Sequence, residues 1–118
     1  MAKHHDTGTL GESLACDYLI TKGFSILQKN WRHKHWEVDI IASREERLHF
    51  IEIKTRRSAI FGHPEDAVSR KKLRNLIDAA EIFLLQNKEW KKIRFDILSI
   101  TLAKGREAGY FFIEDVYL

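Results

Sequence analysis

The stretch HFIEIKTRR, residues His49–Arg57, decides the fold. Its aliphatic residues and Thr55 are typical of a β-strand packed against a core. Glu52 and Lys54 are two residues apart, so the strand period of 2 directs both side chains to one face. Charged groups inside a mostly apolar strand cost free energy unless other groups pair with them. The stretch therefore predicts a core strand that presents an acid and an amine side by side.

The residues before this strand predict a helix and two more strands. Apolar residues at helical spacing predict a helix over Thr9–Lys22, after a loose end at residues 1–6. Strands are expected at Phe24–Arg32 and at residues 36–43, and a charged turn at residues 44–47 leads into the strand of the opening stretch. We expect these three strands to form a meander.

The residues after it predict a crossover. Ser69 is a suitable N-cap for a long helix with an apolar stripe, and strands follow at Lys92–Ile100 and at Tyr110–Leu118. A strand, a helix and a further strand in one sheet form a crossover whose strands are parallel. The expected fold class is α/β, with an αβββαβ core and a mixed five-stranded sheet flanked by helices.

Composition predicts one soluble domain over residues 1–118, with 44% hydrophobic and 31% charged residues. No apolar run approaches the roughly 18 residues of a membrane span, and the N-terminus lacks the apolar region of a signal peptide. We therefore expect a cytoplasmic location and no membrane partner. Cys16 is the only cysteine, which excludes an internal disulfide. The net charge of +3 is weak evidence for a nucleic-acid partner.

Asp39 joins the charged pair as a candidate site residue, because the short turn lets its strand pair with that of Glu52. Two carboxylates on adjacent strands can hold a hard cation such as Mg²⁺ or Mn²⁺. Lys54 would then orient or help deprotonate the attacking water, which makes a minimal set for phosphodiester hydrolysis. The alternative is a cross-strand ion pair on a wet face, the commoner role of such a Glu-x-Lys pair.

Several segments read together resemble one known family. They are GESLACDYL (Gly11–Leu19), GFSILQKNWR (Gly23–Arg32), EVDII (Glu37–Ile41), FIEIKTR (Phe50–Arg56), FGHPEDAV (Phe61–Val68), KKLRNLIDAAEIFL (Lys71–Leu84) and RFDIL (Arg94–Leu98). The chain resembles the PD-(D/E)XK nuclease superfamily and, more narrowly, the YraN-like uncharacterised family of predicted endonucleases. The resemblance implies a restriction-endonuclease-like core and a metal-dependent endonuclease. DNA is the implied partner, with branched or Holliday-junction-like structures as candidate substrates.

The resemblance also implies roles for individual residues. Asp39 and Glu52 fall on the metal-ligand positions, with the backbone carbonyl of Ile53, and Lys54 falls on the catalytic lysine. Glu12 falls on the helical acid that often completes such sites; its alternative is a solvated first-turn glutamate favoured by the helix dipole.

Trp36 and Glu37, a few positions before Asp39 on the same predicted strand, also bear on the candidate site. The family pattern usually has glycine where this chain has Trp36, and a large indole there could narrow the approach of substrate. Glu37 shares a face with Asp39, so it is either a supporting acid behind the metal ligands or half of a structural ion pair.

Cations and aromatic residues alternate in KNWRHKHW (Lys29–Trp36), which suits phosphate contact with base stacking. The alternative is a solvated hairpin edge with both indoles packed inward. Further cations begin the second helix, where the helix dipole disfavours them unless an anion binds. Random surface charge is the alternative there. The candidate nucleic-acid contacts are Arg32, Arg56, Arg57, Arg70 and Lys71, and Lys72 lies in the same first turn.

Two other function classes remain open beside a magnesium-dependent nuclease. One is a non-catalytic nucleic-acid-binding module on a nuclease fold. The other is a protein-interaction subunit that pairs through the terminal strand, Tyr110–Leu118. We also expect a homodimer, because one small domain covers little of a DNA duplex.

Overall fold

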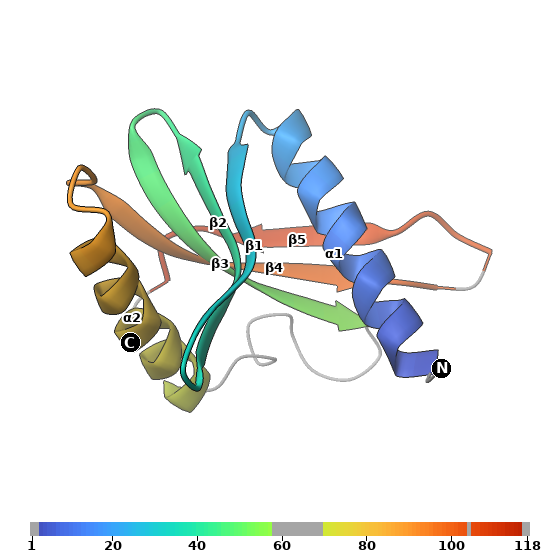
Figure 1. Ribbon diagram of the computed structural model, residues 1–118. Helices are drawn as coiled ribbons and strands as arrows, with labels where there is room; N and C mark the ends of the chain where they lie inside the picture. The colour runs from blue at the N-terminus through green and yellow to red at the C-terminus, as the bar shows by residue number, and fades with distance from the viewer. Residues whose placement is uncertain (1–2, 58–69, 104, 117–118) are drawn as a thin grey trace.

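The computed structural model describes residues 3–57, 70–103 and 105–116, and of residues 3–9 the backbone alone. Five strands form one sheet in the order β1-β2-β3-β4-β5, and two helices pack on it (Figure 1). The elements are α1 (Lys3–Thr21), β1 (Ser25–His33), β2 (Trp36–Arg44), β3 (Arg47–Arg56), α2 (Arg70–Gln86), β4 (Ile93–Thr101) and β5 (Gly109–Ile113). The predicted fold class and order of elements are confirmed.

The sheet is mixed, as the crossover predicts. The first three strands form the expected meander, with β1–β2 and β2–β3 both antiparallel. The connection through α2 then places β4 parallel to β3, with Glu52 opposite Ile97, and β5 pairs antiparallel with β4. The strand of the opening stretch therefore lies in the centre of the sheet, with two strands on each side.

The start of α1 differs from the prediction. The helix begins at Lys3 rather than Thr9, so residues 3–6, expected as a loose end, are helical. The apolar periodicity on which the prediction rested begins only at Leu10, and the preceding polar turn carries no such signal. The predicted N-cap Ser69 lies outside the described residues. Neither described helix is long and apolar enough to cross a lipid bilayer.

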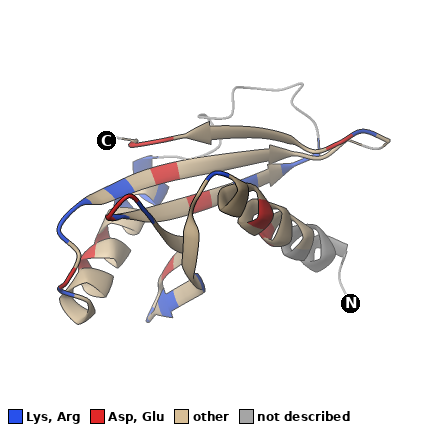
Figure 2. Cartoon of the chain, turned by 90° about the horizontal axis from the view of Figure 1, so that it is seen from above, with Lys and Arg blue, Asp and Glu red and all other residues tan. Residues whose placement is uncertain are grey.

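Each helix packs on its own face of the sheet, because successive residues of β3 point in opposite directions. Ile51 belongs to the cluster that holds Ala15 and Leu19 of α1. Phe50 belongs to the other cluster, with Leu76, Ala79, Ala80 and Phe83 of α2. The strands are mostly uncharged in Figure 2, so the charged positions within them stand out. Glu52 follows the alternation of Phe50 and therefore points to the α2 side.

Candidate active site

Asp39 and Glu52 lie next to each other, just beyond the last recorded pair between β2 and β3. That pair is Ile40 with Ile51, and the two acids are the next residues on their strands. The backbone N–H of Ile53 donates a 2.8 Å hydrogen bond to Asp39 Oδ2, which fixes this carboxylate against β3. The carboxyl groups of Asp39 and Glu52 are also hydrogen-bonded to each other. The structure therefore brings together the two acids that the strand pattern selected.

The surroundings of Glu52 favour its protonated form. Burial is the largest cause that raises the pKa of Glu52, followed by the charge of Asp39 and the hydrogen bond between the two carboxyl groups; together they raise it to about 8. Lys72 and Lys54 act in the opposite direction and offset part of this effect. Two partly buried carboxyl groups in contact cannot both ionise without cost.

Lys54 lies in the same cluster. Burial is the largest cause that lowers the pKa of Lys54, and a contact with the like charge of Lys72 lowers it further. The acids Glu52 and Asp39 partly oppose this shift. A lysine with a lowered pKa is more readily neutral near pH 7, as a proton acceptor must be.

Glu12 lies on α1, next to a close contact between this helix and β3 on the face of the sheet opposite α2. A Cβ on Gly11 would lie 2.3 Å from Thr55 Oγ1, so this crossing requires a residue without a side chain. Next to it, Glu12 Oε2 accepts a 2.6 Å hydrogen bond from Asn30 Nδ2. On β1, Lys29 pairs with Ile40 and Trp31 pairs with Val38 of β2. Asn30, which lies between these two residues, therefore stands opposite Asp39 in the hairpin. Glu12 is therefore tied by an amide to the strand that pairs with that of Asp39, and its role at the site stays a prediction.

In the part of the chain that the structure describes, no three His, Cys, Asp or Glu side chains form a group that could hold a metal ion. The acids that meet there are the pair Asp39 and Glu52. Two carboxyl groups that share a proton offer oxygen donors of the kind that Mg²⁺ and Mn²⁺ prefer. The donor chemistry of the pair thus fits the cation implied by the sequence.

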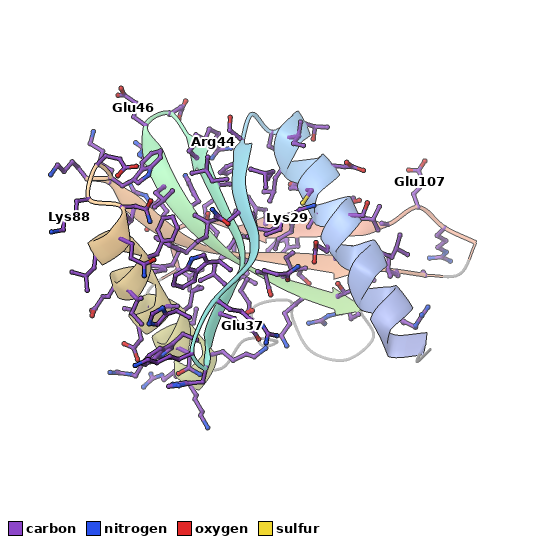
Figure 3. The ribbon with its side chains drawn as sticks, in the orientation of Figure 1. Lys29, Glu37, Arg44, Glu46, Lys88 and Glu107 are labelled. Atoms are coloured by element: carbon purple, nitrogen blue, oxygen red, sulfur yellow. The ribbon has the colours of Figure 1, made fainter. Side chains whose placement is uncertain are left out.

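A hollow of about 110 Å³ opens beside Glu52. It lies between the tip of the β1–β2 hairpin and the first turns of α2, and is lined by His35, Trp36, Glu37, Glu52, Lys72, Asn75 and Leu76. Figure 3 shows Glu37 on this part of the hairpin. Trp36 is one of the residues that line this hollow, and its effect on the approach of substrate stays a prediction.

The contacts of the hairpin show how Glu37 is paired and how the two indoles of the hairpin pack. Arg32 and Glu37 form an exposed ion pair of 3.0 Å, so the structural ion pair expected as one role of Glu37 is present. Trp31 and Trp36 both pack partly buried against the α2 cluster, as in the inward-packed alternative. His33 is half-buried and its ring stacks on Trp31.

The other candidate phosphate contacts lie on two elements that flank the acids. Arg56 is the half-buried last residue of β3 and Arg57 follows it, exposed, at the end of β3 beside α1 (Figure 1). Arg70 and Lys71 are exposed at the start of α2. Their contact with nucleic acid stays a prediction.

Comparison with known proteins identifies the family. The model of a family described as "Uncharacterised protein family UPF0102" matches residues 11–100. The chain belongs to this family. Among similar proteins, a UPF0102 protein of Dictyoglomus thermophilum is 46% identical, with 85% of this chain and 86% of the relative covered. Others come from Flavobacterium psychrophilum, 42% identical over 85% and 84% of the two chains, and Parabacteroides distasonis, 40% identical over 99% and 96%. The YraN-like resemblance is confirmed.

Two members of the site in this UPF0102 protein were not selected from the sequence. Lys72 was noted only among the cations that begin α2, although it lies beside the inward-facing Leu73 and Leu76 of the stripe. Asn30 was not singled out, although counting the hairpin register from its turn would have placed it opposite Asp39. Lys72 depends on how a distant segment folds back over the sheet, whereas Asn30 depends on the register of one hairpin.

Proposed function

We propose that this UPF0102 protein is a Mg²⁺- or Mn²⁺-dependent endonuclease that hydrolyses phosphodiester bonds in DNA. The observation that carries the proposal is the meeting of Asp39 and Glu52 with Lys54 and Lys72 on the α2 side of the sheet. An acid pair that can hold a cation, with an adjacent amine that can accept a proton, suits the hydrolysis of a phosphodiester. A buried ion pair alone would not require two acids in mutual contact.

Each residue has a distinct role in the proposed reaction. Asp39, Glu52 and the backbone carbonyl of Ile53 would hold the ion. When bound, such an ion supplies positive charge against the scissile phosphate and polarises the attacking water. Lys54, with its lowered pKa, orients this water and accepts its proton.

Two further residues support this centre. Lys72 supplies fixed positive charge where negative charge develops on the phosphate oxygens. Glu12 would assist from α1 through Asn30, which donates a hydrogen bond to it and stands opposite Asp39 in the hairpin register.

The substrate that we propose is cytoplasmic DNA, with flapped or four-way structures as the preferred forms. The cations at the end of β3 and the start of α2 flank the acids and would contact phosphates on both sides of the scissile bond. We further propose a homodimer, which would engage two strands or two arms of a branched substrate.

The test uses labelled linear, flapped and four-way DNA incubated with the purified protein in Mg²⁺, Mn²⁺ or EDTA. We expect cleavage only with the cation, and a loss of about hundredfold or more in Asp39→Asn and in Lys54→Met. Glu107→Gln and Lys88→Met are matched controls, since both residues are exposed and lie well away from Glu37 on the hairpin beside the site (Figure 3).

The outcomes separate the function classes. Equal cleavage by wild type, Asp39→Asn and Lys54→Met rejects the assignment. Salt-dependent DNA binding with no cation-dependent product would instead support the non-catalytic binding module. As a readout that does not need turnover, Mg²⁺ should raise the melting temperature of wild type and of Glu107→Gln, but not of Asp39→Asn.

A further inference from the structure

The tip of the β1–β2 hairpin carries a pair of aromatic rings in contact. His33 pairs with Trp36, so Lys34 and His35 form a tight two-residue turn. The ring centroids of His35 and Trp36 are 4.0 Å apart, with 34° between the ring planes. Trp36 is half-buried against the α2 cluster, whereas His35 is exposed. The indole therefore anchors the pair, and the imidazole is its outer member.

The His35–Trp36 pair lies between Glu52 and the hairpin cations, which are Arg32 and Lys34. The hollow of about 110 Å³ that contains Glu52 and Lys72 is walled on one side by both rings. A second hollow, of about 100 Å³, is lined by the same two rings with Glu37, Arg32 and Lys34. Because the two hollows share His35, Trp36 and Glu37, they adjoin at the ring pair, with Glu52 and Lys72 on one side and Arg32 and Lys34 on the other.

The charges that line the two hollows suit a nucleic-acid strand. Lys72 stands at the end near the acids, and Lys34 stands at the hairpin end. The carboxylate of Glu37 would repel a phosphate, but Arg32 pairs with it at 3.0 Å. A backbone phosphate can therefore be contacted at each end, with the aromatic rings between.

We propose that the His35–Trp36 pair binds one unpaired nucleobase beside the scissile phosphate. The substrate class is then DNA that contains a single-stranded segment, such as a flap, a splayed junction or an open end. In an intact duplex both faces of each base are covered by neighbouring bases, so an aromatic pair at the site can engage only a base that has left the stack. This inference rests on the proposed nuclease function and names the substrate of the same site.

The test measures binding without cleavage. Labelled single-stranded DNA, the matching duplex, and a single strand with abasic positions are titrated in EDTA, with fluorescence anisotropy as readout. We expect Trp36→Leu to weaken single-strand binding about tenfold to hundredfold, the range produced by loss of one stacked base, and to leave duplex binding unchanged. Trp36→Phe should retain most of the affinity, and abasic DNA should bind wild type and Trp36→Leu equally.

Two further variants make the test specific. Trp90→Leu is the matched control, because Trp90 is also half-buried and lines a hollow with Glu46, on a turn well away from Glu37 (Figure 3). It should bind single strands like wild type. His35→Ala removes only the exposed ring and should weaken single-strand binding about threefold to tenfold, which serves as the test if Trp36→Leu does not fold.

The inference is overturned if Trp36→Leu and His35→Ala bind single strands as tightly as wild type, or if they lose duplex binding to the same extent. Failure of the nuclease proposal gives a different result. In that case the preference for unpaired bases is present in EDTA, and no cleavage follows when Mg²⁺ is added.

Discussion

At the scale of single residues, the pKa of Glu52 makes the stability of the metal-free protein depend on pH. The carboxyl has an ordinary pKa of 4.5, and burial first, then Asp39, raises it to about 8 in the folded chain. Between these values the folded chain binds a proton that the unfolded chain has lost. The free energy of unfolding therefore falls as pH rises through this window, by up to about 1.4 kcal/mol per pH unit.

Glu52→Gln should remove this dependence. In EDTA we expect the variant to match wild type near pH 4.5 and to exceed its stability at pH 8 by on the order of 1–3 kcal/mol, because the amide carries no charge to bury. Urea unfolding at several pH values measures the difference. Glu107→Gln, an exposed control, should follow wild type throughout; parallel curves for wild type and Glu52→Gln would contradict the pKa argument.

The strand pattern was sufficient to place some site residues and insufficient for others. Period 2 fixes the common face of Glu52 and Lys54, and the short turn between the two strands brings Asp39 beside Glu52. Lys72 reaches them only because the crossover carries α2 back over β3, and no local spacing encodes that distance. Asn30 adopts a left-handed backbone with φ of 53°, where asparagine is enriched, but its place opposite Asp39 follows from the hairpin register and not from that preference.

At the scale of elements, the contact between α1 and β3 depends on Gly11. The missing side chain lets the helix come so close that a Cβ would lie 2.3 Å from Thr55 Oγ1 and 3.3 Å from Thr55 Cβ. Overpacking at such a contact costs about 1–3 kcal/mol, while the gain in helix propensity from glycine to alanine returns up to about 1 kcal/mol. Because the cost of overpacking exceeds the gain in helix propensity, alanine at position 11 should lower the stability of the protein.

Gly11→Ala should lower the free energy of unfolding by about 1–2 kcal/mol. Thr55→Ala removes the nearest atom, so the double variant should regain a large part of that loss. Chemical denaturation of wild type, both single variants and the double variant gives the coupling energy. Strictly additive effects would show that α1 does not rest on Thr55 as the structure has it.

The order of the elements followed from the sequence because each is bounded by a clear local signal. Gly23, with φ of +92°, ends the turn after α1 where a helix stop was expected. The start of α1 could not be predicted in the same way, since its first turns lack an apolar face. The rule for crossovers then fixed the parallel pairing of β3 with β4 without any side-chain information.

At the scale of the whole molecule, a buried polar pair joins segments that are distant in the sequence. His49 Nδ1 and Asp96 Oδ2 are 2.6 Å apart, and the two side chains are 3% and 0% exposed. Asp96 Oδ1 accepts a 2.8 Å hydrogen bond from the backbone N–H of Asp115. The ring of Phe24 packs edge-on against His49. Asp96 thereby connects β3, β4 and the segment after β5, a link that no single strand pattern predicts.

Removing that carboxylate should therefore loosen more than one element. We expect Asp96→Ala to lower the free energy of unfolding by about 3 kcal/mol, because it leaves the buried His49 without its acceptor and also removes the acceptor of the part-buried N–H of Asp115. Ser99→Ala on the same strand is the matched control: among the described residues, Ser99 Oγ is buried without a hydrogen-bond partner, so its loss should cost little or raise stability. Urea unfolding measures both, and hydrogen exchange at Asp115 should accelerate only in Asp96→Ala. A loss below about 1 kcal/mol, or equal effects in the two variants, would mean that packing of the two apolar clusters holds β3, β4 and the C-terminal segment together without the buried pair.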